Sequence, residues 1–195
     1  PEQAVDILAN SYAPNAQSAP AITGLAGGGF VVAWQSTGQD GSGEGVYLQV
    51  FDASGARVGD EIRVNAETSG YQGVVDVVAL SGGGFVASWQ SQTSGGAGDG
   101  SGYAVVAQVF DADGTRVDSE IIVNEQTSGS QTEVRIAALP GGGFVAQWTS
   151  QTSGDAGDGS GSGVFQRVFG DASGYAGSEP PVVEGLPGTL ALTED

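Results

Sequence analysis

Three loops of this chain carry the same four residues, and the chemistry of those residues suits a metal ion. Asp-Gly-Ser-Gly begins at Asp40, Asp99 and Asp158. Calcium prefers carboxylate, hydroxyl and backbone carbonyl oxygens, and glycine lets a loop fold back around the ion. Asp155 adds a further carboxylate to the third loop only. The candidate calcium ligands are therefore Asp40, Ser42, Asp99, Ser101, Asp155, Asp158 and Ser160.

The same loops have a second interpretation that needs no metal. An aspartate in a turn accepts hydrogen bonds from backbone N–H groups of its own turn and so caps it. The loops also lack the dense carboxylates of an EF-hand. Calcium is thus the candidate cofactor, and both interpretations stand at this point.

Aromatic side chains beside these loops could stack on the rings of a sugar. Tyr47, Tyr103 and Phe165 lie close to the three loops in the sequence, and such rings present a large apolar surface. With Asp99 and Asp158 they form the candidate ligand-binding set. The three tryptophans occupy alternating apolar positions instead and are expected in the core, namely Trp34, Trp89 and Trp148.

The charge balance excludes several kinds of partner. The 195 residues include 23 Asp and Glu against 5 Lys and Arg, a net charge of −18. Nucleic acid and anionic lipid both require clustered basic side chains, so neither is expected as a partner.

Without cysteine or histidine the chain can build neither the usual zinc sites nor a Ser-His-Asp triad. We therefore expect a protein that is not an enzyme.

Two further absences bear on where the chain belongs. No apolar run reaches the length of a membrane-spanning helix, which predicts no membrane insertion. Methionine is absent, even at position 1, which suggests a piece of a longer polypeptide.

One unit is written three times along the chain. Tryptophan recurs at positions 34, 89 and 148, spacings of 55 and 59 residues, whereas phenylalanine recurs at 51, 110 and 169, with 59 residues at both steps. The later copies therefore carry four extra residues in the loop between the Trp strand and the Phe strand. Variation in length at one loop of each repeat often marks a functional face.

Each copy contains four short strand signals with period-two alternation. In the first copy these are 6–10, 20–25, the strand of Phe30 and Trp34, and 46–51. A glycine triplet before each Phe-Trp strand predicts a tight hairpin, and Asp-Ala-x-Gly predicts the turn that closes each unit. The counterparts of the first signal are 61–65 and 120–124.

These signals predict an all-β fold of three four-stranded repeats with threefold pseudosymmetry, at about 6–60, 61–119 and 120–178. We expect a small propeller-like closed ring in which the strand at 6–10 pairs with the last unit and removes the open edges. A trefoil-like barrel and a ring completed by dimerisation are the alternatives. Residues 1–178 would form this domain, and the Pro-rich segment 179–195 would be an extended linker to a following domain.

The combined pattern resembles a known class of repeat. Gly-Gly-Phe-Val-x-x-Trp-x-Ser, Asp-Gly-Ser-Gly, Gln-Val-Phe-Asp-Ala-x-Gly and Glu-Ile-x-Val-Asn, over about 6–178, are similar to repeats of the large type I-secreted, calcium-dependent bacterial adhesins of the repeats-in-toxin class. The resemblance implies an extracellular, cell-surface location and a ligand-binding module. The Gly-Gly-x-Gly-x-Asp calcium repeat of that class is absent, so calcium rests on the loops alone.

These observations lead to one expected function and two alternatives. We expect a non-catalytic, calcium-assisted module of a bacterial adhesin that binds a cell-surface glycan, or a surface protein of a host or neighbouring cell, as a monomer within a longer chain. The main alternative is a structural spacer or protein-interaction domain. A glycoside hydrolase is the third, although the scattered arginines and loose loop pattern favour it least.

Overall fold

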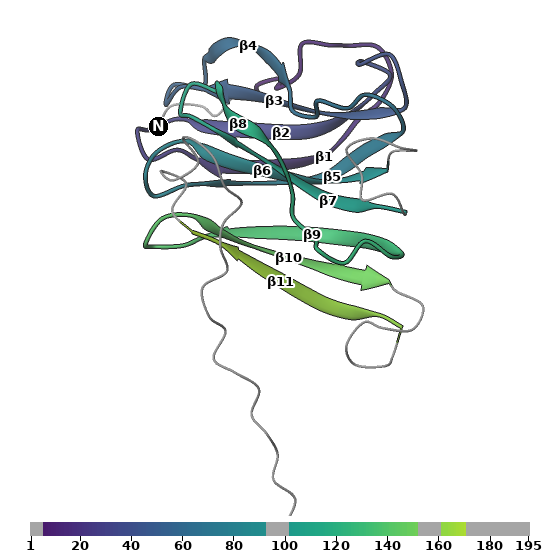
Figure 1. The fold of residues 1–195 in the computed structure, drawn as a ribbon. Coiled ribbons are helices and arrows are strands. Elements are labelled where there is room, and N and C mark those ends of the chain that lie inside the picture. The colour runs from purple at the N-terminus through teal and green to yellow at the C-terminus, as the bar shows by residue number, and fades with distance from the viewer. Residues whose placement is uncertain (1–5, 93–101, 152–160, 171–195) are drawn as a thin grey trace, which may run out of the picture.

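The computed structural model describes residues 6–92, 102–151 and 161–170, and in these residues every regular element is a β-strand. Three antiparallel sheets follow one another along the chain (Figure 1). The first contains β1 (Gln17–Gly24), β2 (Phe30–Thr37), β3 (Glu44–Phe51) and β4 (Arg57–Arg63). The second contains β5 (Tyr71–Ala79), β6 (Phe85–Gln92), β7 (Ala104–Phe110) and β8 (Arg116–Ile122). The third contains β9 (Ser130–Ala138), β10 (Phe144–Gln151) and β11 (Gly163–Phe169).

The hairpins form where the sequence predicts them. In the turn before β2, the Gly28 N–H donates to the Leu25 carbonyl and the Leu25 N–H donates to the Gly29 carbonyl. Gly28 and Gly29 both have positive φ, which explains why glycine occupies these positions. Beyond this turn, Phe30 stacks on Phe51 across the β2–β3 ladder with centroids 4.9 Å apart, and both later sheets repeat this pair.

The sheets lie in layers, with the second between the first and the third (Figure 1). Two cores fill the spaces between them. The first joins Val31 and Leu48 of the first sheet to Phe85 and Trp89 of the second. The second joins Val86 and its neighbours to the third sheet, whose largest contributors are Phe144, Trp148 and Phe169. Each inner sheet face is therefore apolar, and all three tryptophans are buried as the alternation predicts.

A bulge recurs in the first strand of each sheet. The register shifts there, and the residue at the bulge has a positive φ in all three copies, at Ala19, Val74 and Glu133. A bulge increases local twist and bends the strand. The fourth strands share a similar feature at Gly59 and Asp118.

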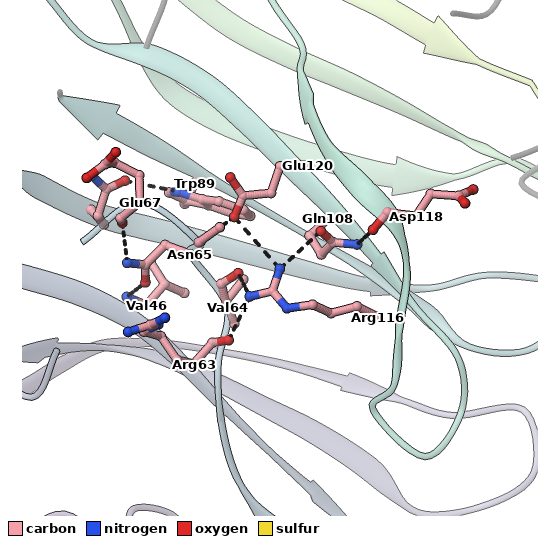
Figure 2. Close-up of polar contacts among 12 residues, drawn as sticks. Val46, Arg63, Val64, Asn65, Glu67, Trp89, Gln108, Arg116, Asp118 and Glu120 are labelled. Carbon is pink, nitrogen blue, oxygen red and sulfur yellow. Dashed lines mark hydrogen bonds and ion pairs between the residues drawn. The ribbon is translucent and has the colours of Figure 1, made fainter. Parts of the chain in front are cut away.

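A polar clamp joins consecutive sheets at their outer strands (Figure 2). Nη2 of Arg116, at the start of β8, donates to the carbonyls of Arg63 and Val64 at 2.9 and 2.5 Å. Glu120, on the same strand, accepts the Ala66 N–H. Burial raises the pKa of Glu120, and the hydrogen bond from Ala66 opposes this rise. The clamp thus provides hydrogen-bond partners for backbone groups where the last strand of the preceding sheet ends.

The prediction of a strand at residues 6–10 was wrong. These residues form no strand, and their carbonyls instead accept hydrogen bonds from Arg57: Nη2 lies 2.9 Å from the Leu8 and Asn10 oxygens. The signals at 61–65 and 120–124 begin inside β4 and β8, which are the last strands of the first two sheets. A strand needs a neighbour for its ladder, and residues 6–10 have none in the described chain.

The all-β prediction is confirmed, and 11 strands are described rather than the expected 12. Sheet-to-sheet contacts join the first sheet to the second and the second to the third, and no barrel closes in the described residues. No described residue belongs to a helix that could span a membrane.

Candidate functional site

The first of the three predicted metal loops is a turn capped by its own aspartate. Oδ1 of Asp40 accepts the Ser42 N–H at 3.2 Å, and Oδ2 accepts Nδ2 of Asn65 at the same distance. Asn65 is 1% exposed, and its Oδ1 accepts the Val46 N–H at 2.8 Å. Both carboxylate oxygens therefore bind protein donors and link the loop to the segment after β4.

No group of three or more acidic side chains gathers in the described residues in a way that could hold a metal ion. The donors around Asp40 thus fit a turn cap better than a calcium site. The other predicted ligands lie outside the described residues, so calcium at those loops stays a prediction: Asp99, Ser101, Asp155, Asp158 and Ser160.

Replacing Asp40 with alanine should lower the free energy of unfolding by about 1–2 kcal/mol, because two donors lose their acceptor. Urea unfolding would measure this loss with added calcium and with EDTA. Asp60→Ala is the matched control, since it removes the same charge from an exposed strand position and should change stability by less than about 0.5 kcal/mol. A loss that appears only with calcium would instead identify Asp40 as a metal ligand.

Two of the three predicted aromatic ligand residues contribute to packing. Tyr47 is 6% exposed, and burial together with the nearby Asp40 carboxylate raises its pKa to about 12. Its hydroxyl therefore stays protonated throughout the physiological range. Phe165 is half-buried and stacks on Trp148 with centroids 6.3 Å apart. Neither ring is an open platform for a ligand.

Tyr103, the third predicted residue, belongs to a pair of tyrosines. Its ring meets that of Tyr71 edge to face, with centroids 5.7 Å apart. Tyr103 precedes β7, whereas Tyr71 begins β5, and both side chains are half-buried. The Tyr71 hydroxyl donates to Oε1 of Gln35 in the first sheet at 3.1 Å. Burial, Tyr103 and Glu44 raise the pKa of Tyr71, so its hydroxyl remains available as a donor.

Gly73 makes room for this pair. A Cβ atom at Gly73 would lie 2.6 Å from the Tyr71 hydroxyl and 2.3 Å from Oε1 of Gln35. Any larger residue would displace one of these groups. The glycine, the two tyrosines and the glutamine therefore form one unit, which we call the tyrosine site: Gln35, Tyr71, Gly73 and Tyr103.

The tyrosine site breaks the repeat, and this distinguishes it from the core. In the first copy Ala16, Ser18 and Glu44 occupy the positions of Tyr71, Gly73 and Tyr103. In the third copy the corresponding residues are Ser130, Thr132 and Ser162. A residue that the fold requires should recur in all copies, as the tryptophans do. The sequence contained this signal, but it lies at positions where the copies differ rather than at those where they agree.

An open groove that the sequence did not predict lies at the end of the second and third sheets that is far from the tyrosine site. Its volume is about 350 Å³, and it lies among glycine turns and the ends of β7 and β8. Leu80, Val109, Phe110 and Val117 make its walls largely apolar. Oδ1 of Asp111, its one carboxylate, accepts the N–H groups of Asp113 and Thr115 and so caps its own turn. Asp111 is the one charged side chain in the lining, and it serves its own turn rather than projecting toward a ligand.

Comparison with known proteins gives no relative for this chain. No family model matches it, and neither a curated protein nor a solved structure matches it.

Proposed function

We propose that this domain is a non-catalytic binding module that recognises a neutral glycan through the tyrosine site. The observation that supports the proposal is the Tyr71–Tyr103 pair, which two sequence segments of the second sheet bring together and which the other copies lack. Tyrosine combines an apolar ring for sugar C–H groups with a hydroxyl for sugar hydroxyls. The Gln35 amide and the nearby Glu44 add polar groups that could recognise hydroxyls.

The charge of the chain restricts the class of glycan. A net charge of −18 repels sialylated or sulfated sugars, and the site contains no arginine. The same acidity is compatible with calcium assistance at the loops of Asp99 and Asp158. A secreted bacterial adhesin at the cell surface remains the setting that the repeat pattern suggests.

The main alternative is a structural spacer or protein-interaction domain. Ile22 in the first sheet and Val164 and Val168 in the third favour it, because these apolar side chains are exposed whereas their counterparts in the other copies pack into the two cores. A closed propeller-like ring would be compatible with both glycan binding and protein interaction. Closing the ring would cover those apolar side chains, and it would hold the loops at one rim.

A glycan array of neutral and sialylated sugars, followed by calorimetry with the strongest neutral oligosaccharide, tests the proposal. Tyr103→Leu keeps an apolar side chain but removes the ring, and we expect it to weaken binding by about 1–3 kcal/mol, or roughly 5- to 150-fold. Tyr71→Phe should weaken binding less, because it keeps the ring and removes one hydroxyl.

Phe165→Leu is the matched control, because it removes a half-buried ring in the third sheet, away from the pair. It should leave the affinity unchanged. An array without neutral hits would contradict the proposal, as would equal losses for Tyr103→Leu and Phe165→Leu. Repeating the titration with EDTA shows separately whether calcium contributes.

A further inference from the structure

The two ends of the sheet stack expose residues that the repeat elsewhere buries. Val164 and Val168 of β11 are 70% and 56% exposed. Their counterparts in β3 and β7 face the two cores, at exposures between 0% and 5%: Val46, Val50, Val105 and Val109. The outer face of the third sheet thus has the apolar pattern of a face that carries another sheet.

The first sheet shows the complementary pattern on its outer side. Ile22 of β1 is 67% exposed, whereas its counterpart Val77 is 5% exposed and packs against the first sheet. The third counterpart, Ile136, packs into the second core. The first sheet therefore presents the kind of face that the second and third sheets use to dock on the sheet before them.

The segment before β1 resembles the end of an outer strand. Residues 6–11 correspond by repeat to 61–66, the end of β4 and the exit that follows it. Arg57 and Glu61 bind residues 8–11 as Arg116 and Glu120 bind residues 63–66. This segment lies where the end of an outer strand of a preceding sheet would lie. The described third sheet has three strands and no outer fourth one.

We infer that two copies of this chain associate head to tail, the third sheet of each docking on the first sheet of the other. Both contacts continue the packing already seen between consecutive sheets, with residues 6–11 of one copy beside β11 of its partner. Three sheets from each copy would make a closed ring of six, within the usual range of four to eight propeller blades. Head-to-tail contacts close in this way when the rotation between units permits it.

Ile7 supports this placement. It is 51% exposed, whereas its counterparts Ile62 and Ile121 pack against the two cores. Docking of a partner's third sheet beside residues 6–11 would cover Ile7, just as the cores between consecutive sheets cover Ile62 and Ile121. The contact would thus be apolar, while each copy carries a net charge of −18. Added salt should therefore strengthen association, because it screens the repulsion between copies.

Sedimentation equilibrium from micromolar to near-millimolar concentration, at low and high salt, tests the inference. We expect monomers and dimers only, with more dimer at high salt. Ile22→Glu and Val168→Glu should each weaken the dimer by about 100-fold or more, because each places a charge in both interfaces. Ile122→Glu, at a position 41% exposed on the outer strand of the middle sheet, is the matched control and should leave the dimer intact.

Mixing the two variants distinguishes head-to-tail docking from other dimers. An equimolar mixture of Ile22→Glu and Val168→Glu chains contains one pairing in which both charges share an interface and the other interface is unaltered. The mixture should therefore form dimers where either variant alone does not. Near-ultraviolet circular dichroism of each variant checks that the buried tryptophans keep their packing. A monomer at all concentrations, an open series of larger species, or a mixture that stays monomeric would overturn the inference.

Discussion

Replacing Trp89 with alanine is expected to lower the free energy of unfolding by about 3–5 kcal/mol. Its indole is 1% exposed and packs in the core between the first and second sheets, beside Phe85 and Val106. Alanine would leave a large cavity that the surrounding strands can fill only partly. Equilibrium unfolding in urea, followed by far-ultraviolet circular dichroism, measures the change.

The indole N–H makes a second, separable contribution. Nε1 of Trp89 donates to Oε1 of Gln72 at 3.3 Å, whereas Nε1 of Trp148 and Oε1 of Gln131 have no partner. Trp→Phe keeps most of the ring volume but removes this donor. Trp89→Phe should therefore cost about 1 kcal/mol more than Trp148→Phe. Equal costs for the two substitutions would show that the hydrogen bond to Gln72 contributes little.

Much of the fold follows from the sequence because the determining interactions are local. Period-two alternation placed Trp34, Trp89 and Trp148 in the core, and all three are buried. Glycine triplets predicted hairpins because the first turn needs positive φ at Gly28 and Gly29. A capped turn was one of two interpretations for Asp40, and its hydrogen bonds to Ser42 and Asn65 match that interpretation.

The assignment of strands to sheets did not follow from the sequence. Residues 6–10 resemble 61–65, yet only the latter lie partly in a strand, because only they have a preceding strand to pair with. The pattern of apolar residues in a segment does not show whether a neighbouring strand is present for it to pair with. Tyr71 was overlooked for a related reason: its contact with Tyr103 joins residues 32 positions apart across two strands, and a linear search of the loops does not bring them together.

The repeat itself indicates which residues serve the fold and which serve something else. Positions that recur in all copies are needed for packing, as the phenylalanine pairs across the second and third strands of each sheet are. Residues that differ from the repeat are not needed for that packing. The tyrosine site is such a departure, and the third sheet shows another, since Arg167 replaces the glutamine found at Gln49 and Gln108. Arg167 pairs with Glu125 at 2.9 Å and donates to the Val123 carbonyl, so it takes over part of the clamp.

Two adjacent glycines in the hairpin before β6 should respond very differently to alanine. Gly83 and Gly84 both have positive φ, at 91° and 76°. A Cβ atom at Gly83 would meet nothing within 4 Å, whereas one at Gly84 would lie 2.3 Å from the Phe110 carbonyl oxygen. Gly83→Ala should therefore cost only the strain of the left-handed conformation, about 1–2 kcal/mol.

Gly84→Ala adds a backbone clash to that strain and should cost about 2–5 kcal/mol. The clash cannot be relieved by a side-chain rotation, because its other partner is a carbonyl in the β7 strand that stacks Phe110 on Phe85. Thermal and urea unfolding of the two variants side by side measure the difference, and Gly83→Ala controls for φ. Similar losses for both would mean that the hairpin moves freely against β7, which would also remove the reason for the glycine triplet in each copy.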